Sequence, residues 1–275
     1  MAKIIEKRHL TPITRLFVID APLHALNAAP GQFVIVRVHE QGERVPISIT
    51  DFDHEAGTLT IVVQEVGKTT SMICALEEGD EILDFAGPLG LPVALPDTGH
   101  VVLVGGGFGA GAVYPLAREL RRRGVRVTSI VGARTAELVI LRELLEPVSD
   151  DYLVCTDDGS LGYHGFVTGR LEELLNEDGD LTGCFAIGPM PMMRAVAGVT
   201  SQYGLSTMVS LDPIMVDGTG MCGACRVTVD GEVKFACVDG PFFDAAKVNF
   251  DEAVVRSKMY VDEEKLALEL AGAKE

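Results

Sequence analysis

The sequence predicts a β-barrel, then a doubly wound parallel α/β domain, then a small metal-binding module. Short β-rich runs separated by turn residues fill positions 3–86, and from His100 strands alternate with glycine-bearing loops and helices. Three of the six cysteines fall between Cys222 and Cys237. A chain of 275 residues is long enough for two domains and a small appendix.

The first part contains β-rich runs at 13–20, 33–39, 45–50, 59–66 and 81–86. Turn signals at 29–31, 55–57 and 78–80 separate them, and such spacing is typical of a small closed barrel or a sandwich. A short helix is expected at 69–76, where Thr69, Thr70 and Ser71 are plausible caps.

The second part alternates between strands and helices and predicts a parallel sheet covered by helices on both faces. The expected strands are 101–104, 125–131, 152–156, 184–187 and 205–209, and the expected helices are 112–123, 138–145, 169–175 and 191–203. We therefore divide the chain into 1–97, 98–208, the cysteine-containing module 209–250, and a helix or frayed tail at 251–275.

The net charge of −17 excludes some classes of partner. Such a charge repels a phosphate backbone and an anionic lipid surface, so neither nucleic acid nor membrane is expected. The start of the chain is too charged for a secretory signal, and no apolar run of about 18 residues occurs. The expected location is the cytoplasm.

The cysteine cluster has a spacing with chemical meaning. Plant-type [2Fe–2S] sites use C-x4-C-x2-C and a distant fourth cysteine, and here Asp217 stands at the first position, before Cys222, Cys225 and Cys237. Asp230-Gly231 predicts a type I′ hairpin whose register carries Cys237 opposite Ala224, between the other two cysteines. A zinc site with the same four residues and unligated thiols are the alternatives. Cys74, Cys155 and Cys184 are expected to be small buried side chains.

A glycine-rich segment, 105–111, lies between a strand and a helix, the context in which backbone approaches a pyrophosphate. The acidic residue expected about twenty positions later is missing, and Arg134 stands there instead. Arg134 could contact a 2′-phosphate, stack on adenine or be solvated. The loops at 156–162 and 188–193 end strands at the same sheet edge, where they either share a ligand or form tight turns.

The barrel offers a second candidate for phosphate binding. Arg44 precedes the expected strand 45–50 and Pro46 and Ser48 lie on it, and the segment from Gly67 to Thr70 opens the short helix. Together these two segments could hold the phosphates of a dinucleotide, whereas alone each is an ordinary solvated surface.

These motifs together resemble the ferredoxin-reductase-like electron-transfer subunits, which include that of dihydroorotate dehydrogenase B. The resemblance covers nearly the whole chain and rests on R-x-P-x-S, the glycine-rich nucleotide domain, G-P-x-P-M-M and D-x4-C-x2-C-x11-C. The stretch 212–225, with aspartate in place of the first cysteine, is more similar to the small (alpha) subunit of NADH-dependent ferredoxin:NADP oxidoreductases, also called sulfide dehydrogenase beta subunit.

The resemblance implies three cofactors and their ligands. FAD would be held by Arg44, Pro46, Ser48, Gly67, Lys68, Thr69 and Thr70. NAD(H) or NADP(H) would be held by Gly107, Gly109, Arg134, Asp158, Gly188, Pro189 and Met192. A [2Fe–2S] cluster would be held by Asp217, Cys222, Cys225 and Cys237.

The expected activity follows from electron counting. A nicotinamide delivers a hydride, a [2Fe–2S] centre carries one electron, and a flavin exchanges with both, so no acid–base residue or nucleophile is predicted. The resemblance implies a heterodimer with a larger flavin and iron–sulfur subunit, and ferredoxin reached through that complex. Whether electrons are bifurcated stays open. The alternatives are a dihydroorotate dehydrogenase role and a zinc-stabilised nucleotide-binding module without turnover.

Overall fold

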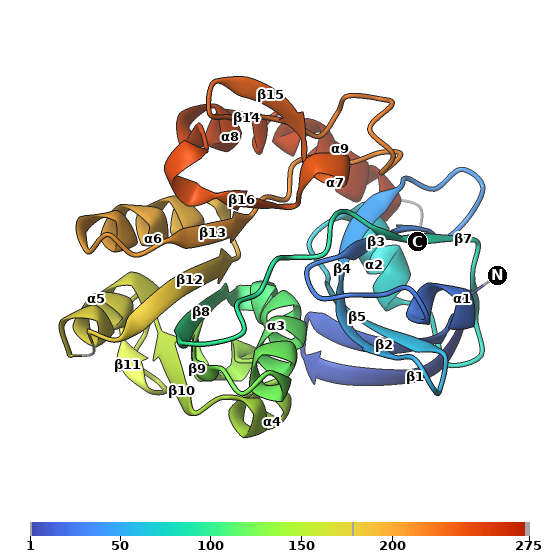
Figure 1. Ribbon diagram of the computed structural model, residues 1–275. Coiled ribbons are helices and arrows are strands. Elements are labelled where there is room, and N and C mark those ends of the chain that lie inside the picture. The colour runs from blue at the N-terminus through green and yellow to red at the C-terminus, as the bar shows by residue number, and fades with distance from the viewer. Residues whose placement is uncertain (1, 178, 273–275) are drawn as a thin grey trace.

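The computed structural model describes residues 2–177 and 179–272, and these form a barrel, a second sheet with its helices and a C-terminal module (Figure 1). The barrel is one antiparallel sheet in the order β6-β1-β2-β5-β4-β3-β7. Its strands are β1 (Ala2–Thr11), β2 (Thr14–Asp20), β3 (Phe33–Arg37), β4 (Val45–Asp53), β5 (Thr58–Gln64), β6 (Glu81–Ile82) and β7 (Asp84–Leu89). The predicted barrel is confirmed as a nearly closed sheet.

The two edges of this sheet meet at a single residue. β6 and β7 lie at opposite edges and are separated by Leu83 alone. The prediction of one strand at 81–86 is therefore wrong, because the local pattern does not show that the chain changes partner there. β1 was not predicted at all, since its middle carries the charged residues Glu6, Lys7 and Arg8 on partly exposed positions.

Two short helices cover the barrel, α1 (Pro22–Ala25) and α2 (Lys68–Cys74). The hydroxyl residues expected before α2 lie inside it. Thr70 Oγ1 accepts hydrogen bonds from the N–H groups of Val66 (3.0 Å) and Gly67 (2.9 Å), so Thr70 satisfies donors at the start of the helix from within the first turn.

The second sheet has the order β11-β10-β9-β8-β12-β13-β16 and is parallel except for its last strand. The strands are β8 (His100–Gly106), β9 (Arg126–Ala133), β10 (Asp151–Thr156), β11 (Tyr163–His164), β12 (Leu181–Ile187), β13 (Thr207–Ser210) and β16 (Phe242–Asp244). The chain runs outward from β8 to one side and then resumes at β12 on its other side. The strand order therefore reverses between β8 and β12, which is where open α/β sheets bind ligands.

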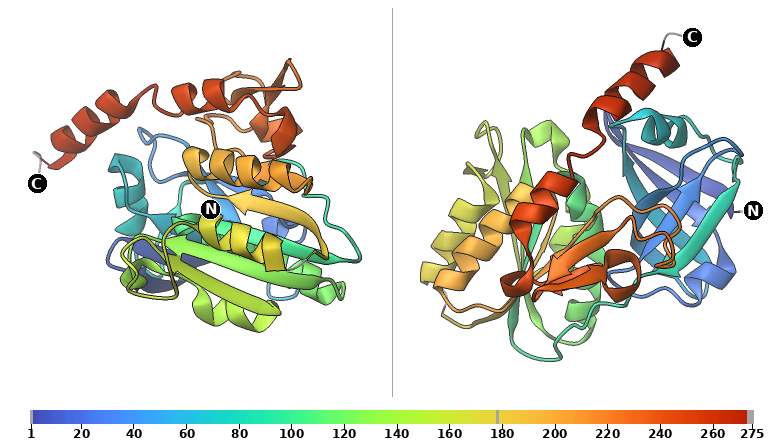
Figure 2. Two further views of the ribbon diagram at one scale, coloured as in Figure 1. Left: turned by 90° about the vertical axis from the view of Figure 1, so that its left-hand side faces the viewer. Right: turned by 90° about the horizontal axis from the view of Figure 1, so that it is seen from above.

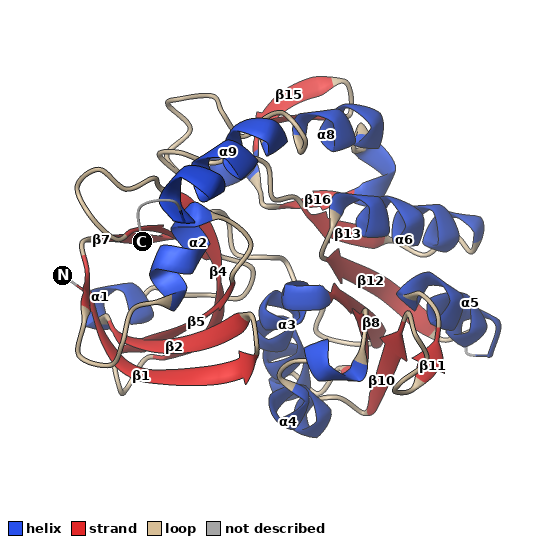
Figure 3. Cartoon of the chain, turned by 180° about the vertical axis from the view of Figure 1, so that it is seen from behind, coloured by secondary structure: helices blue, strands red, loops and turns tan. Residues whose placement is uncertain are grey.

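Helices α3 (Ala110–Arg122), α4 (Arg142–Leu145), α5 (Val167–Glu177) and α6 (Met190–Gln202) accompany this sheet (Figure 3). The expected helix at 138–145 is divided into a 3-10 turn at Ala136–Leu138 and α4. Leu141, between them, has a φ of 56° and interrupts the helical path.

The C-terminal module contains β14 (Arg226–Val229), β15 (Glu232–Phe235), α7 (Ala236–Asp239), α8 (Phe250–Arg256) and α9 (Val261–Gly272). The hairpin has the predicted register, with Val229 opposite Glu232, and positive φ at both Asp230 (55°) and Gly231 (74°). The module then returns to the second sheet, because its β16 pairs antiparallel with β13. Figure 2 shows the C-terminal end of α9 projecting beyond the other elements, although α9 also contacts α2.

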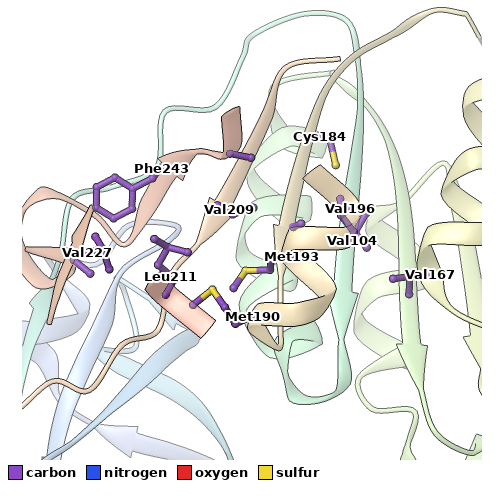
Figure 4. Close-up of a cluster of buried hydrophobic side chains, with 14 of the residues drawn as sticks. Val104, Val167, Cys184, Met190, Met193, Val196, Val209, Leu211, Val227 and Phe243 are labelled. Carbon is purple, nitrogen blue, oxygen red and sulfur yellow. The ribbon is translucent and has the colours of Figure 1, made fainter. Parts of the chain in front are cut away.

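The three parts share buried side chains. On one face of the second sheet, Val209, Met190 and Met193 pack in the same cluster as Val227 and Phe243 of the module (Figure 4). Two barrel residues, Phe33 and Ile35, belong to this cluster too. Burying each such apolar side chain contributes about 1.5–3 kcal/mol, so the parts stabilise one another. The division at 97/98, 208/209 and 250/251 stays a proposal.

Among the described helices, none combines the length and the apolar composition that crossing a bilayer requires.

Candidate functional site

Helix α3 fixes the barrel against the second sheet. A Cβ on Gly111, in its first turn, would lie 3.1 Å from Thr50 Oγ1 of β4, so this glycine permits the close approach. Arg118, further along α3, pairs with Asp51 and stacks over Phe52, 4.7 Å from the ring centroid. Burial raises the pKa of Asp51 despite this arginine. The outer face of β4 is thereby held beside the end of β8.

A cavity of about 160 Å³, here the central cavity, lies at this junction. Pro46, Ile47, Ser48 and Thr50 line it from β4, and the alternation of the strand turns Pro46, Ser48 and Thr50 to the same side. The opposite wall includes Phe108 and Gly109 after β8 and Gly188 after β12, and it is completed by segment 210–212 and by Met215 and Pro241.

Arg44 lies outside the central cavity, in a groove that also includes Asp84 and Asp217. Its guanidinium is 3.4 Å from Asp84 Oδ2, an oxygen that Arg37 Nε approaches to 2.5 Å. The hydrogen bond from Arg37 lowers the pKa of Asp84. About 45% of the Arg44 side chain is exposed, so its ion pair is weak and exchangeable.

The start of α2 is joined to the segment before β4. Thr69 Oγ1 donates a 2.6 Å hydrogen bond to Glu43 Oε2, next to Arg44 in the chain. The structure therefore brings the predicted FAD residues Gly67, Lys68, Thr69 and Thr70 close to the Arg44 segment. The Thr69 hydroxyl is already engaged with Glu43, so its contribution is to position the two segments.

A second recess, here the side pocket, has a volume of about 490 Å³ and opens on the other side of Phe108. Of the residues predicted for the nicotinamide nucleotide, Gly107, Arg134, Pro189 and Met192 line it. Gly109 and Gly188 line the central cavity instead.

Asp158 is absent from the residues that line either space. Its carboxylate accepts hydrogen bonds from Ser160 Oγ (2.6 Å) and Ser160 N (3.0 Å), which lower its pKa. The neighbouring Asp157 lines the side pocket.

The loop after β8 packs closely against the loop after β12, and this packing requires glycine at some positions. A Cβ on Gly109 would lie 2.9 Å from the carbonyl carbon of Ile187 and closer still to its oxygen. Gly188 has a φ of 153°, and its Cβ would lie 3.0 Å from Gly106 Cα. Gly107 differs, since it has a φ of 57° and no atom lies within 4 Å of an added Cβ. The backbone at Gly107 is therefore open toward the side pocket.

The predicted iron ligands lie in two pairs. Asp217 accepts hydrogen bonds from the N–H groups of Thr219 (2.8 Å) and Cys222 (2.9 Å), and the first of these is the main cause of its lowered pKa. Cys225 and Cys237 are buried with their Sγ atoms 3.2 Å apart. Cys222 is exposed. Within residues 2–177 and 179–272, no group of three or more His, Cys, Asp or Glu side chains converges as a complete metal site.

Cys237 reaches Cys225 by a path that the register did not predict. The pairing of β14 with β15 ends at Arg226 and Phe235. One further backbone hydrogen bond follows, in which the Ala236 N–H donates to Cys225 O at 3.1 Å. Asp239 Oδ2 accepts from Phe235 N at 2.6 Å, and the chain turns into α7. Cys237 therefore lies in a helical turn beside Cys225 rather than in a strand opposite Ala224.

The donor set fits an iron–sulfur cluster. Two thiols are already in contact and buried, and burial raises the pKa of the Cys237 thiol to about 12. Gly218, Gly220 and Gly223 have φ values of 75°, 83° and 68°, so the loop from Asp217 to Cys225 makes its turns at residues that carry no side chain. Three thiolates and one carboxylate would suit either iron or zinc by chemistry alone.

Among the residues that line these spaces, sequence reasoning did not predict Thr50, Phe108, Asp157 or Asp212 as site residues. Phe108 lines both the central cavity and the side pocket, and Asp212 lines the central cavity. The strand alternation that marks Arg44, Pro46 and Ser48 extends to Thr50 and could have identified it. No local pattern marks Asp212, because its position depends on where β13 ends.

Two protein families match parts of the chain. Residues 1–92 match an oxidoreductase FAD-binding domain, and residues 212–249 match the iron–sulfur cluster binding domain of dihydroorotate dehydrogenase B. The second match favours an iron–sulfur cluster over zinc.

Full-length relatives are also similar to this chain. An uncharacterised Clostridium beijerinckii protein is 46% identical over 272 residues, covering 96% of this chain and 92% of that protein. The Thermotoga maritima homologue of the dihydroorotate dehydrogenase B (NAD(+)) electron transfer subunit is 44% identical over 267 residues, covering 97% and 94%. A chain from the solved NADH-dependent reduced ferredoxin-NADP oxidoreductase is 43% identical with a TM-score of 0.93, covering 98% and 97%.

Proposed function

Because the chain belongs to the family of dihydroorotate dehydrogenase B-type electron-transfer subunits, we propose that it is the small subunit of an NADH-dependent ferredoxin–NADP oxidoreductase. The chain is an electron-transfer oxidoreductase subunit with an FAD-binding barrel, a nucleotide-binding sheet and an iron–sulfur module. The proposal adds the electron donor, the residues of each site and the partner.

The observation that carries the proposal is the wall shared by the two spaces. Phe108 lines both the central cavity and the side pocket, while Gly188 lines the first and the adjacent Pro189 lines the second. A ligand in the side pocket is therefore separated from one in the central cavity by one side chain and one loop. When bound, the flavin accepts a hydride from the nicotinamide and releases electrons singly to the cluster.

The proposed FAD site uses the outer face of β4 and the start of α2. Pro46, Ser48 and Thr50 face the central cavity, and Arg44 is available to a phosphate once it exchanges Asp84 for that stronger partner. Arg44→Ala should weaken FAD retention by about tenfold or more, since a charge-assisted pair is worth about 1.5–3 kcal/mol. Arg44→Lys keeps the positive charge, so its affinity for FAD should fall less than that of Arg44→Ala. Equal FAD dissociation constants in all three proteins would reject this assignment.

The proposed nucleotide is NADH. Asp157 and Arg134 line the same pocket at the ends of β10 and β9, and a carboxylate there suits a ribose 2′-hydroxyl while repelling a 2′-phosphate. Arg134 is then left to stack on the base. Stopped-flow reduction of bound FAD by NADH and by NADPH tests this assignment. NADH should reduce the flavin faster than NADPH, and Asp157→Asn should make the two rates more similar. A preference for NADPH that Arg134→Ala abolishes would reverse the assignment.

The proposed partner is a larger flavin and iron–sulfur subunit that docks near Cys222. Cys222 is the exposed member of the ligand set, so the cluster would lie nearest to solvent on that side. Co-purification under native conditions tests for such a partner. The names of the family and of the Thermotoga relative favour one alternative, a dihydroorotate dehydrogenase partner. Dihydroorotate-dependent reduction of NAD⁺ by the purified complex would select that alternative.

A further inference from the structure

The function proposed above leaves one proton behind in each cycle. A hydride carries two electrons and one proton, whereas an iron–sulfur cluster conducts electrons only. For every hydride that enters the central cavity, two electrons leave through the module and one proton remains. A group that borders that cavity can accept the proton and release it to water.

Asp212 is placed to be that group. It lies two residues after the end of β13 and lines the central cavity together with Ser48, Ser210 and Gly109. Of the described residues that form the wall, Asp212 is the one with an ionisable side chain. The remaining wall residues come from β3, β4, β5, the start of α3, the end of β12, the loops after β8, β12 and β13, and Pro241, and all of them are apolar, hydroxyl-bearing or glycine.

The carboxylate of Asp212 is also free to react. Among the described residues it has no salt bridge, and its own backbone N–H is the one hydrogen-bond donor to it. The side chain is exposed, yet protein surrounds it so closely that desolvation governs its ionisation. Asp212 therefore borders the central cavity and is also accessible to solvent water.

We propose that the Asp212 carboxylate accepts the proton that remains in the central cavity after the two electrons of a hydride have left, and passes it to solvent water. The inference rests on the proposed function, in which hydride enters and single electrons leave. In the reverse direction, two electrons arrive through the module and Asp212 in its acid form supplies the proton that leaves as part of the hydride. Charge and atoms balance in both directions.

The ionisation of Asp212 suits this role. Desolvation raises its pKa to about 6, and no charged neighbour offsets this shift. A pKa near the working pH lets a group accept a proton and release it again with little free-energy cost. At pH 7.5 the carboxylate form predominates and is ready to accept a proton.

The test uses the chain loaded with FAD, without nucleotide or partner. The midpoint potential of the flavin is measured from pH 5 to pH 8 with a chemical reductant and mediators. In the native protein the dependence on pH should change slope near the pKa of Asp212, because reducing the nearby flavin favours the protonated acid. Asp212→Asn should remove the change of slope, and Asp212→Glu should restore it at a shifted pH.

A second readout follows the proton directly. Infrared difference spectra of reduced minus oxidised protein, with ¹³C-labelled aspartate, should show one protonated carboxyl signal that is absent from Asp212→Asn. Transfer of electrons from reduced flavin to a one-electron acceptor at pH 7.5 should slow by about tenfold or more in Asp212→Asn and recover in Asp212→Glu. Glu172→Gln, which neutralises an exposed carboxylate on α5, should change none of these measurements.

The outcomes are separable from those that test the proposed function. A change of slope that persists in Asp212→Asn, or no aspartate signal in the native difference spectrum, would overturn the role of Asp212. If Asp212→Asn fails to retain FAD, the infrared spectrum of the native protein alone decides. Failure of NADH to reduce the flavin would reject the proposed donor, yet it would leave the potential and the infrared result standing.

Discussion

The glycine loop at 105–109 and the cysteine loop at 217–225 both turn through positive φ angles, but different atoms hold them. The first is enclosed by protein, since Gly106 and Gly109 have no room for a Cβ beside Met192 and Ile187. The second is packed in its first half, where a Cβ would lie 2.6 Å from Leu89 Cδ1 at Gly218 and 3.0 Å from Val238 Cγ2 at Gly220. At Gly223 the nearest atom would be 3.8 Å away.

This difference indicates how each site is completed. The glycine loop has its final shape from the packing of β8 against β12, so it offers a preformed surface to its ligand. The cysteine loop is fixed at Asp217 and at the buried pair Cys225 and Cys237, and Cys222 is exposed between them. We expect metal to complete the second site, because four ligands bound to one cluster close the loop.

The largest effect is expected from Cys222→Ser. Loss of a thiolate at the open side should reduce the iron content from that of a full cluster to background. The stability of the iron-free protein should change by less than about 0.5 kcal/mol, because this side chain is exposed. Iron analysis, the visible spectrum and urea unfolding of the apoprotein check both parts.

Cys74→Ala is the matched control for Cys222→Ser, since it removes a buried barrel thiol and should leave iron unchanged. Full iron content in Cys222→Ser would show that this residue is not a ligand.

Gly109→Val should lower the stability of the folded protein. Its side chain would collide with the backbone of Ile187, which cannot move without disturbing β12. We expect a loss of about 3 kcal/mol or more in the free energy of unfolding. Urea unfolding measures this loss. Native-like stability in this variant would mean that the two loops are not packed as described.

Asp217 variants test the fixed end of the cysteine loop. Asp217→Ala removes two hydrogen bonds as well as the carboxylate, and it should loosen iron without abolishing its binding. Asp217→Cys should keep the cluster but change its EPR spectrum and reduction potential, because thiolate is a softer and more covalent ligand. If iron content, spectrum and potential are the same in both variants as in the native protein, Asp217 is a turn residue only.

The smallest effect is expected from Gly107→Ala. An added Cβ meets no atom within 4 Å, but a non-glycine residue at a φ of 57° costs about 1 kcal/mol. Stability should fall by that amount, and the affinity for NADH should fall further because the Cβ points into open space at the side pocket. Equilibrium titration with NADH, compared with urea unfolding, separates the two losses. A loss as large as that in Gly109→Val would contradict the distinction between the two glycines.

Several features were predictable because they depend on neighbours in the chain. Alternating and helical periods identified most barrel strands and the strand–loop–helix order of the second domain. Asp230-Gly231 specified its hairpin, since a type I′ turn needs positive φ at two successive residues. The spacing of Asp217 and Cys222 brought them together, because a short glycine-rich loop can return its own backbone N–H to the carboxylate.

Other features depended on partners far away in the sequence. The run 81–86 carries one local pattern, yet its halves join opposite edges of the barrel, because sheet closure selects each partner. Phe242–Asp244 joins the second sheet because β13 leaves an edge there, which the sequence of the module does not reveal.

Asp212 shows most clearly why function needed the tertiary structure. Sequence alone determined that an aspartate follows a strand. Only the packing of β4, α3 and β12 around it decided that this carboxylate lines a cavity without a charged partner. Desolvation depends on all the atoms that surround a group, and most of those atoms come from residues distant in the chain.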